Sequence, residues 1–99
     1  METRAVTHPE ELLDERGLSR LKWRCRRGLL ENDIFIERFF RRFESGLTVK
    51  QSQGLSALME LSDNDLLDLH LARKTLAQVD AGLDRDDVRE VLGMLRETL

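Results

Sequence analysis

The sequence predicts an all-α protein, a compact single-domain bundle of about five short helices. Apolar residues recur every three or four positions, and no stretch alternates apolar and polar residues as a half-buried strand would. Capping residues and glycines separate the periodic segments at short intervals. With 99 residues, 40% of them hydrophobic and nineteen of them Leu, the chain has material for one core. A domain this small needs its interior for side-chain packing, which argues against a large cofactor cavity.

The N-terminal part divides into a lead-in and a first helix. Residues 1–16 lack a firm pattern and are expected to form a flexible lead-in to a helical domain over residues 17–99. The first helix is predicted to begin at or just before Ser19 and to end near Gly28. Its apolar face consists of Leu18, Leu21, Cys25 and Leu29.

The second helix has the clearest pattern and is expected to lie at the centre of the core. Either Asn32 or Asp33 is predicted to cap it, and Ser45 and Gly46 end it. The four-residue spacing of its aromatic residues is the ordinary spacing of a core helix. Its apolar stripe consists of Phe35, Ile36, Phe39, Phe40 and Phe43.

Three further segments read as helices. Thr48 and Gln51 have the spacing of a capping box that opens a third helix, in which Gly54 is a local weakness. Ser62 or Asp63 caps a fourth. Residues 71–79 either continue that helix or form a second short one. A break at residues 80–82 precedes a last helix, for which Asp84 is the predicted cap and Asp86 and Asp87 lie in the first turn.

The residue content excludes several kinds of site. One Cys forms no internal disulfide, and two His with one Cys do not supply four zinc ligands. His8 and His70 are expected to be surface or packing residues, and Cys25 a small buried hydrophobe rather than a reactive thiol. No catalytic grouping and no phosphate-binding loop is present, so we predict no catalytic residues and no enzyme activity of the chain itself. No apolar signal or membrane-spanning segment is seen, and a cytoplasmic protein is expected.

Charge is unevenly distributed along the chain. The net charge is −3, but residues 16–59 carry ten basic and four acidic side chains, whereas both flanking segments are acidic. The stretch from Arg16 to Arg27 contains six cations and no acid. This pattern points to an acidic partner surface, a phosphate-bearing ligand or nucleic acid.

A short motif follows the basic stretch. Arg27 offers planar bidentate donors, Gly28 permits a turn or the close approach of another surface, and Glu31 supplies an acceptor. Spacing alone fits an ordinary ion pair between residues four apart on a helix equally well.

The wider segment resembles a known family. Leu21-Lys22-Trp23-Arg24-Cys25-Arg26-Arg27-Gly28-Leu29-Leu30-Glu31-Asn32-Asp33, followed by Phe39-Phe40, is similar to the signature of the FAD assembly factors of succinate dehydrogenase, small proteins with an RGxxE motif. The resemblance continues through residues 58–67 and covers about residues 17–97. The chain departs from the family pattern at Asn32, where an apolar residue is common, and over residues 69–80.

The resemblance implies a function. Such factors are five-helix domains that bind the flavoprotein subunit of succinate dehydrogenase, and in some bacteria that of fumarate reductase, and promote covalent attachment of FAD to a His of that subunit. Carried onto this chain, the partner-binding residues would be Arg27, Gly28 and Glu31, with Trp23, Arg24 and Asp33 beside them. The FAD belongs to the partner, and no tightly bound cofactor, no metal and a monomeric chain are expected.

Two other readings rank lower. Direct FAD binding and delivery by the factor lacks a phosphate-binding loop to support it. A small helical nucleic-acid-binding or antitoxin-like regulator would use the basic stretch from Arg16 to Arg27. It is disfavoured by a pI near 5.4 and by the lack of a recognition helix.

Overall fold

The computed structural model describes residues 11–26 and 28–97, and these form six α-helices and two 3-10 turns. The helices are α1 (Glu15–Arg24), α2 (Leu30–Phe43), α3 (Val49–Leu58), α4 (Asp63–His70), α5 (Leu76–Val79) and α6 (Asp86–Glu97), and the turns are Glu44–Gly46 and Ala81–Leu83. An isolated antiparallel bridge joins Leu12 to Thr48. The all-α prediction is confirmed, and the one-turn helix α5 is the second short piece that the sequence left open.

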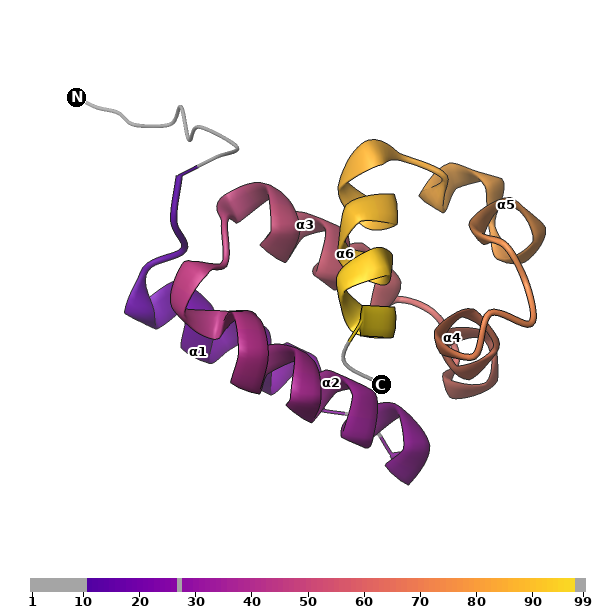
Figure 1. Cartoon of the computed structure of the whole chain (residues 1–99), viewed down its shortest axis with the longest axis horizontal. Coiled ribbons are helices and arrows are strands. Elements are labelled where there is room, and N and C mark those ends of the chain that lie inside the picture. The colour runs from indigo at the N-terminus through magenta and orange to yellow at the C-terminus, as the bar shows by residue number, and fades with distance from the viewer. Residues whose placement is uncertain (1–10, 27, 98–99) are drawn as a thin grey trace.

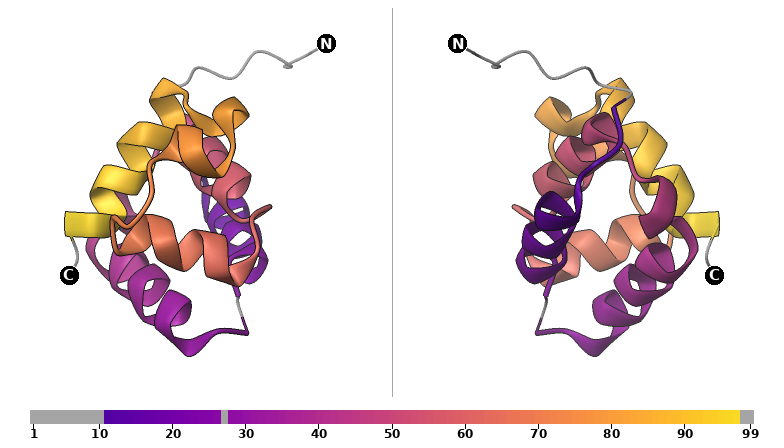
Figure 2. Two further views of the ribbon diagram at one scale, coloured as in Figure 1. Left: turned by 90° about the vertical axis from the view of Figure 1, so that its right-hand side faces the viewer. Right: turned by 90° about the vertical axis from the view of Figure 1, so that its left-hand side faces the viewer.

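The helices pack around one core. Helix α3 packs along α6 (Figure 1), and α1 contacts α3. Helix α2 contacts α4 and α6, and α4 also contacts α6. The turn between α1 and α2 lies on the side of the molecule away from α5 in both views of Figure 2. None of the described helices has the length and apolar character needed to cross a membrane.

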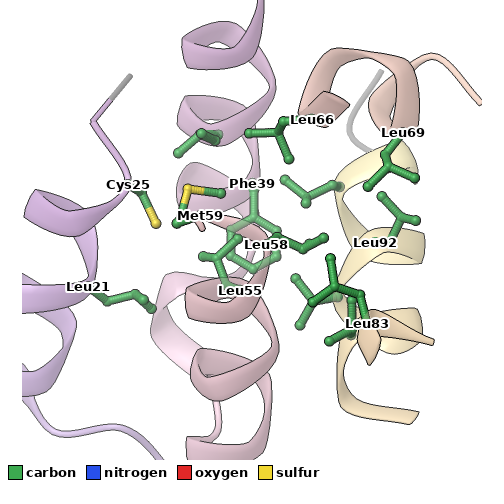
Figure 3. Packing of buried hydrophobic residues seen from close by; sticks show 14 of the residues in the cluster. Leu21, Cys25, Phe39, Leu55, Leu58, Met59, Leu66, Leu69, Leu83 and Leu92 are labelled. Atoms are coloured by element: carbon green, nitrogen blue, oxygen red, sulfur yellow. The ribbon is translucent and has the colours of Figure 1, made fainter. Parts of the chain in front are cut away.

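The predicted aromatic stripe of α2 forms the centre of the core. Phe39 is fully buried, Phe35, Ile36 and Phe40 are buried, and Phe43 packs at the edge. Figure 3 shows leucines of α3, α4 and α6 around Phe39. The fully buried leucines include Leu55, Leu58, Leu66, Leu69 and Leu95. Burial of each such side chain contributes about 1.5–3 kcal/mol, so this cluster is the main source of stability.

Several predicted helix ends are confirmed. Thr48 Oγ1 accepts from the Gln51 amide at 3.2 Å and Gln51 Oε1 from the Thr48 amide at 3.0 Å, which is the complete capping box. Ser62 Oγ accepts from the Asp65 amide at 3.2 Å and caps α4. The first turn of α6 carries Asp86 and Asp87 as predicted.

The end of α4 explains why the chain does not continue as one helix. Ala72 adopts a left-handed conformation with φ of 58°. The Arg73 amide donates to the Asp68 carbonyl at 2.8 Å and the Ala72 amide to the Leu69 carbonyl at 3.1 Å. This is the Schellman pattern, usually completed by glycine, and it turns the chain away from the helix axis.

Other predicted helix starts are wrong. Helix α1 begins at Glu15 rather than near Ser19, because Asp14 Oδ1 accepts from the Gly17 amide at 2.6 Å and caps it. The boundary of the predicted lead-in therefore falls within α1, and its residues 1–10 lie outside the described residues. Helix α6 begins at Asp86, and the Asp84 carboxylate binds the Arg89 guanidinium at 2.7 Å instead of capping the helix.

The predicted caps of α2 are also wrong, and Gly54 has another role. Helix α2 begins at Leu30 with Leu29 as N-cap, because the Asn32 side chain is used in a contact with α4. Gly54, predicted to be a local weakness of α3, serves the packing of this helix. A Cβ atom there would lie 2.4 Å from the backbone carbonyl oxygen of Asp87, so the glycine lets α3 and α6 pack closely.

Candidate functional site

The candidate site is built around the motif turn, defined here as residues 25, 26 and 28–31, which comprise the described connection between α1 and α2 and the first two residues of α2. Helix α1 ends at Arg24 and α2 begins at Leu30, so the turn joins the end of one helix to the start of the next. Cys25 is buried in the core, as predicted, and fixes the start of the turn. Arg27, the first residue of the predicted motif, lies outside the described residues.

Gly28 and Glu31 are both exposed, and neither has an evident task within the fold. Gly28 has no positive φ, and a Cβ atom there would meet only the Asp63 Oδ2 atom, at 3.8 Å. The backbone conformation at this position is therefore open to other residues, and the predicted special turn is not what requires a glycine here. Glu31 lies in the first turn of α2, where its charge is favourable to the helix dipole, and it forms no ion pair with a described residue.

The other candidate residues lie around the turn but not in one cluster. Trp23 is 72% exposed, and the Arg26 guanidinium lies 4.8 Å from its ring centroid. Arg24 points toward the end of α3 and pairs with Glu60 at 2.5 Å. Asp33 lines a groove between α1 and α2. The structure thus places Trp23 and Arg24 on one side of the turn and Asp33 on the other.

The basic stretch is partly neutralised by acids from distant parts of the chain. Lys22 pairs with Glu44 of the following 3-10 turn, and Arg24 pairs with Glu60 beyond α3. No acid is near these cations in the sequence, but the fold brings Glu44 and Glu60 beside them. Exposed pairs of this kind add at most about 1 kcal/mol each, but they reduce the positive field that nucleic acid would need.

Two apolar residues at the site were not predicted. Leu30 is 68% exposed and Ile34 40% exposed, and the two lie four residues apart on α2, on either side of Glu31. Large apolar side chains exposed together beside a charged residue are typical of a protein-binding surface. The sequence could have indicated their exposure, because Leu30 and Ile34 do not share the four-residue register of Phe35 and Phe39 on the buried stripe of α2.

Of the two histidines, the structure describes His70 alone. His8 lies outside the described residues. His70 is buried at the end of α4, and its ring centroid lies 4.4 Å from that of Phe35, which confirms a packing role.

The fold and the site define a class of protein, a small all-helical domain with an exposed motif turn suited to binding another macromolecule. A family profile described as "Flavinator of succinate dehydrogenase" (Sdh5) matches residues 19–98. The chain belongs to this family, which assigns it a role in the flavinylation of succinate dehydrogenase.

Individual relatives agree. The chain is 52% identical to the FAD assembly factor SdhE of Ralstonia nicotianae over 84% of each chain. It is 44% identical to SdhE of Vibrio cholerae over 48% of this chain and 56% of that protein. It is 36% identical to SdhE of Coxiella burnetii over 57% of this chain and 68% of that protein. No solved structure gives a significant match.

Proposed function

We propose that the chain binds the flavoprotein subunit of succinate dehydrogenase through the motif turn and so promotes covalent attachment of FAD to a His of that subunit. The observation that carries the proposal is the exposure of Gly28 and Glu31. Both belong to the family's motif, both are exposed, and the fold makes little use of either. Residues of this kind are best explained by contacts with another molecule.

The surface around the turn has the composition of a protein interface. Trp23 and Arg26 form an exposed stacked pair, and Leu30 and Ile34 add apolar area next to Glu31. Tryptophan and arginine are enriched among the residues that dominate binding energies. An open backbone at Gly28 lets the partner's main chain approach closely.

The chain acts as a helper rather than as the catalyst. Attachment requires loss of a proton from the flavin 8-methyl carbon, attack on that carbon by a His nitrogen of the flavoprotein, which gives up its own proton, and groups that stabilise the negative charge developing on the ring. The electron pair enters the isoalloxazine, so the linked flavin is formed two-electron reduced and an electron acceptor then reoxidises it. The flavoprotein and its FAD supply all of these groups. A small bound domain contributes by holding mobile parts of the subunit so that the His and the charge-stabilising groups are aligned.

FAD itself stays with the flavoprotein in this proposal. The groove between α1 and α2 contains cations suited to a pyrophosphate, but Lys22 is paired with Glu44 and Arg41 with Glu37, and Arg26 lies over the Trp23 ring. Binding of a phosphate by Lys22 or Arg41 would have to break their pairs. We expect no tight FAD site on the isolated chain, which a calorimetric titration with FAD tests directly.

The remaining parts of the proposal come from the family resemblance. The chain is proposed to act as a monomer in the cytoplasm and to accept the flavoprotein of fumarate reductase as a second client. Incubation with either purified apo-flavoprotein distinguishes one client from two.

The decisive experiment is a reconstituted flavinylation reaction. Apo-flavoprotein, FAD and the chain are combined, and covalent flavin is read as fluorescence of the flavoprotein band in a denaturing gel. Glu31→Ala and Gly28→Arg should fold normally and lose at least about tenfold in rate, since a desolvated interface contact contributes about 2 kcal/mol or more.

Matched controls exist on the same chain. Glu15 lies in the first turn of α1, as Glu31 lies in the first turn of α2. Glu15→Ala therefore removes an equivalent favourable interaction with a helix dipole, at the end of α1 that is away from the motif turn. Gly93 is exposed on α6, and a Cβ atom there would meet nothing within 4 Å, so Gly93→Arg controls for Gly28→Arg. Both controls should retain activity. Unfolding of both motif variants would make the motif structural, and full activity of both would refute the proposal.

A further inference from the structure

Helix α2 carries Glu31 in its first turn, yet no side chain caps the start of this helix. Its N-cap residue is Leu29, with an extended backbone and no side-chain hydrogen bond to the helix. By contrast, Asp14, Thr48 and Ser62 cap α1, α3 and α4 through side-chain oxygens. The direction of the motif turn where it enters α2 must therefore be fixed by something other than a local cap.

Asn32 supplies that support from within the first turn of α2. Its side chain is fully buried, and Nδ2 donates to the Asp63 carbonyl oxygen at 2.9 Å and to Asp63 Oδ1 at 3.1 Å. Asp63 is itself held in place by the fold, because it is the first residue of α4, directly after the capping Ser62. Helix α4 is anchored in the core through Leu66 and Leu69, both fully buried.

The same carboxylate lies beside the other end of the turn. Asp63 Oδ1 accepts from Asn32, and Asp63 Oδ2 lies 3.8 Å from the position that a Cβ atom of Gly28 would occupy. Asp63 therefore binds the residue that follows Glu31, and its other carboxylate oxygen lies near the open space beside Gly28, three residues before Glu31. A residue 31 positions away from Asn32 in sequence holds the backbone on which the exposed motif residues are presented.

We propose that Asn32 and Asp63 form a clamp that positions the motif turn for the flavoprotein, Asn32 and Asp63 being positioning residues that do not themselves contact the partner. The inference rests on the proposed function and deepens it. It also gives a role to Asn32, which stands where the family commonly has an apolar residue. In this chain a polar contact between α2 and α4 fixes the turn.

The test separates positioning from folding. Asn32 Oδ1 is buried without a hydrogen-bond partner, so Asn32→Leu replaces a half-satisfied amide by an apolar side chain of similar size. We expect the melting temperature to stay within about 5 °C of the wild type. We also expect flavinylation to fall about tenfold, the equivalent of one hydrogen bond to a charged group.

Variants of Asp63 grade the effect. Asp63→Ala removes one of the two acceptors of Asn32 Nδ2 and leaves the backbone carbonyl, so part of the contact with Asn32 should remain. Asp63→Asn keeps an oxygen in the place of Oδ1 and should restore most of the activity. Asp65→Ala is the matched control, because Asp65 is also an acid in the first turn of α4 and has the same relation to the helix dipole.

A readout without the flavoprotein completes the test. Amide hydrogen exchange of the isolated chain should be faster over residues 28–33 in Asn32→Leu and unchanged in α3 and α6. In the double variant Asn32→Leu with Asp63→Ala, the loss of flavinylation should be smaller than the sum of the two single losses, because both variants remove the same contact. Unchanged exchange, additive losses, or full activity of Asn32→Leu would overturn the clamp. If Glu31→Ala loses activity while Asn32→Leu does not, the proposed function stands and the clamp fails.

Discussion

Replacement of Gly28 by alanine separates the needs of the fold from those of the partner. The backbone of Gly28 is not left-handed, and the added Cβ atom meets only Asp63 Oδ2 at 3.8 Å, an ordinary van der Waals distance. Alanine also restricts the unfolded chain, which stabilises a compatible site by about 0.4–1 kcal/mol. For a domain of this size we expect a melting temperature unchanged or raised by up to about 8 °C.

The same substitution should impair binding. If the flavoprotein backbone packs directly on Gly28, the methyl group overfills that contact at a cost of about 1–3 kcal/mol, or roughly 5- to 150-fold in the dissociation constant. Thermal unfolding followed by circular dichroism and calorimetric titration of apo-flavoprotein measure the two effects separately. A lower melting temperature would show that the glycine serves the fold, and unchanged affinity would refute close approach of the partner.

Gly54 provides the opposite case. A Cβ atom at this position would lie 2.4 Å from the Asp87 carbonyl oxygen, which is backbone and cannot rotate away. Gly54→Ala should therefore lower the melting temperature of the isolated chain, whereas Gly28→Ala should not. The pair shows that the surroundings of a glycine, rather than its presence in a helix or a turn, decide the effect of substitution.

Three further outcomes are expected. Phe39→Ala should cost about 3–5 kcal/mol of unfolding free energy in urea titrations, because the ring is fully buried. Ala72→Gly should gain about 1 kcal/mol, seen as a higher melting temperature, because it relieves the left-handed φ of 58° at the end of α4. A hydrogen bond from the side-chain Nε2 of Gln51 to Glu90 Oε2, at 2.9 Å, lowers the pKa of Glu90. The interactions of the ionised Glu90 thus add about 0.5 kcal/mol or less to the free energy of unfolding at this exposed site. This stabilisation is present above the usual carboxyl pKa and is lost as the pH falls through the lowered pKa of Glu90. Glu90→Gln should reduce that acid-dependent loss in urea titrations at pH 3 and pH 7.

The parts of the fold that depend on neighbouring residues could be predicted from the sequence. The stripe around Phe39 follows from four-residue spacing, and the capping box of Thr48 and Gln51 follows from two residue types three positions apart. The start of α1 was missed because Asp14 precedes any apolar periodicity. The start of α2 was missed because Asn32, a good capping residue, forms a tertiary contact instead.

The site shows the same division. The resemblance placed the motif at Gly28 and Glu31, and both are exposed as a binding surface requires. The sequence could not indicate that Glu60 neutralises Arg24, since 36 positions separate them. Nor could it indicate the clamp, because Asp63 next to Ser62 reads only as part of a helix cap. Contacts between residues distant in sequence are set by the packing of whole helices.

A binding turn has to be exposed to its partner and yet keep one conformation. Asn32 is fully buried, whereas Gly28 and Glu31 are exposed, so the turn is held only on its inner side. A buried amide directed at the fixed end of α4 holds the backbone from behind and leaves the outer face open. Fixing one residue costs about 1–2 kcal/mol of backbone entropy, so ordering even two residues in advance saves a few kcal/mol when the partner binds. That saving corresponds to at least about tenfold in affinity, which is comparable to a direct contact. The clamp can thus matter to flavinylation as much as the exposed motif residues do, although it lies on the inner side of the turn.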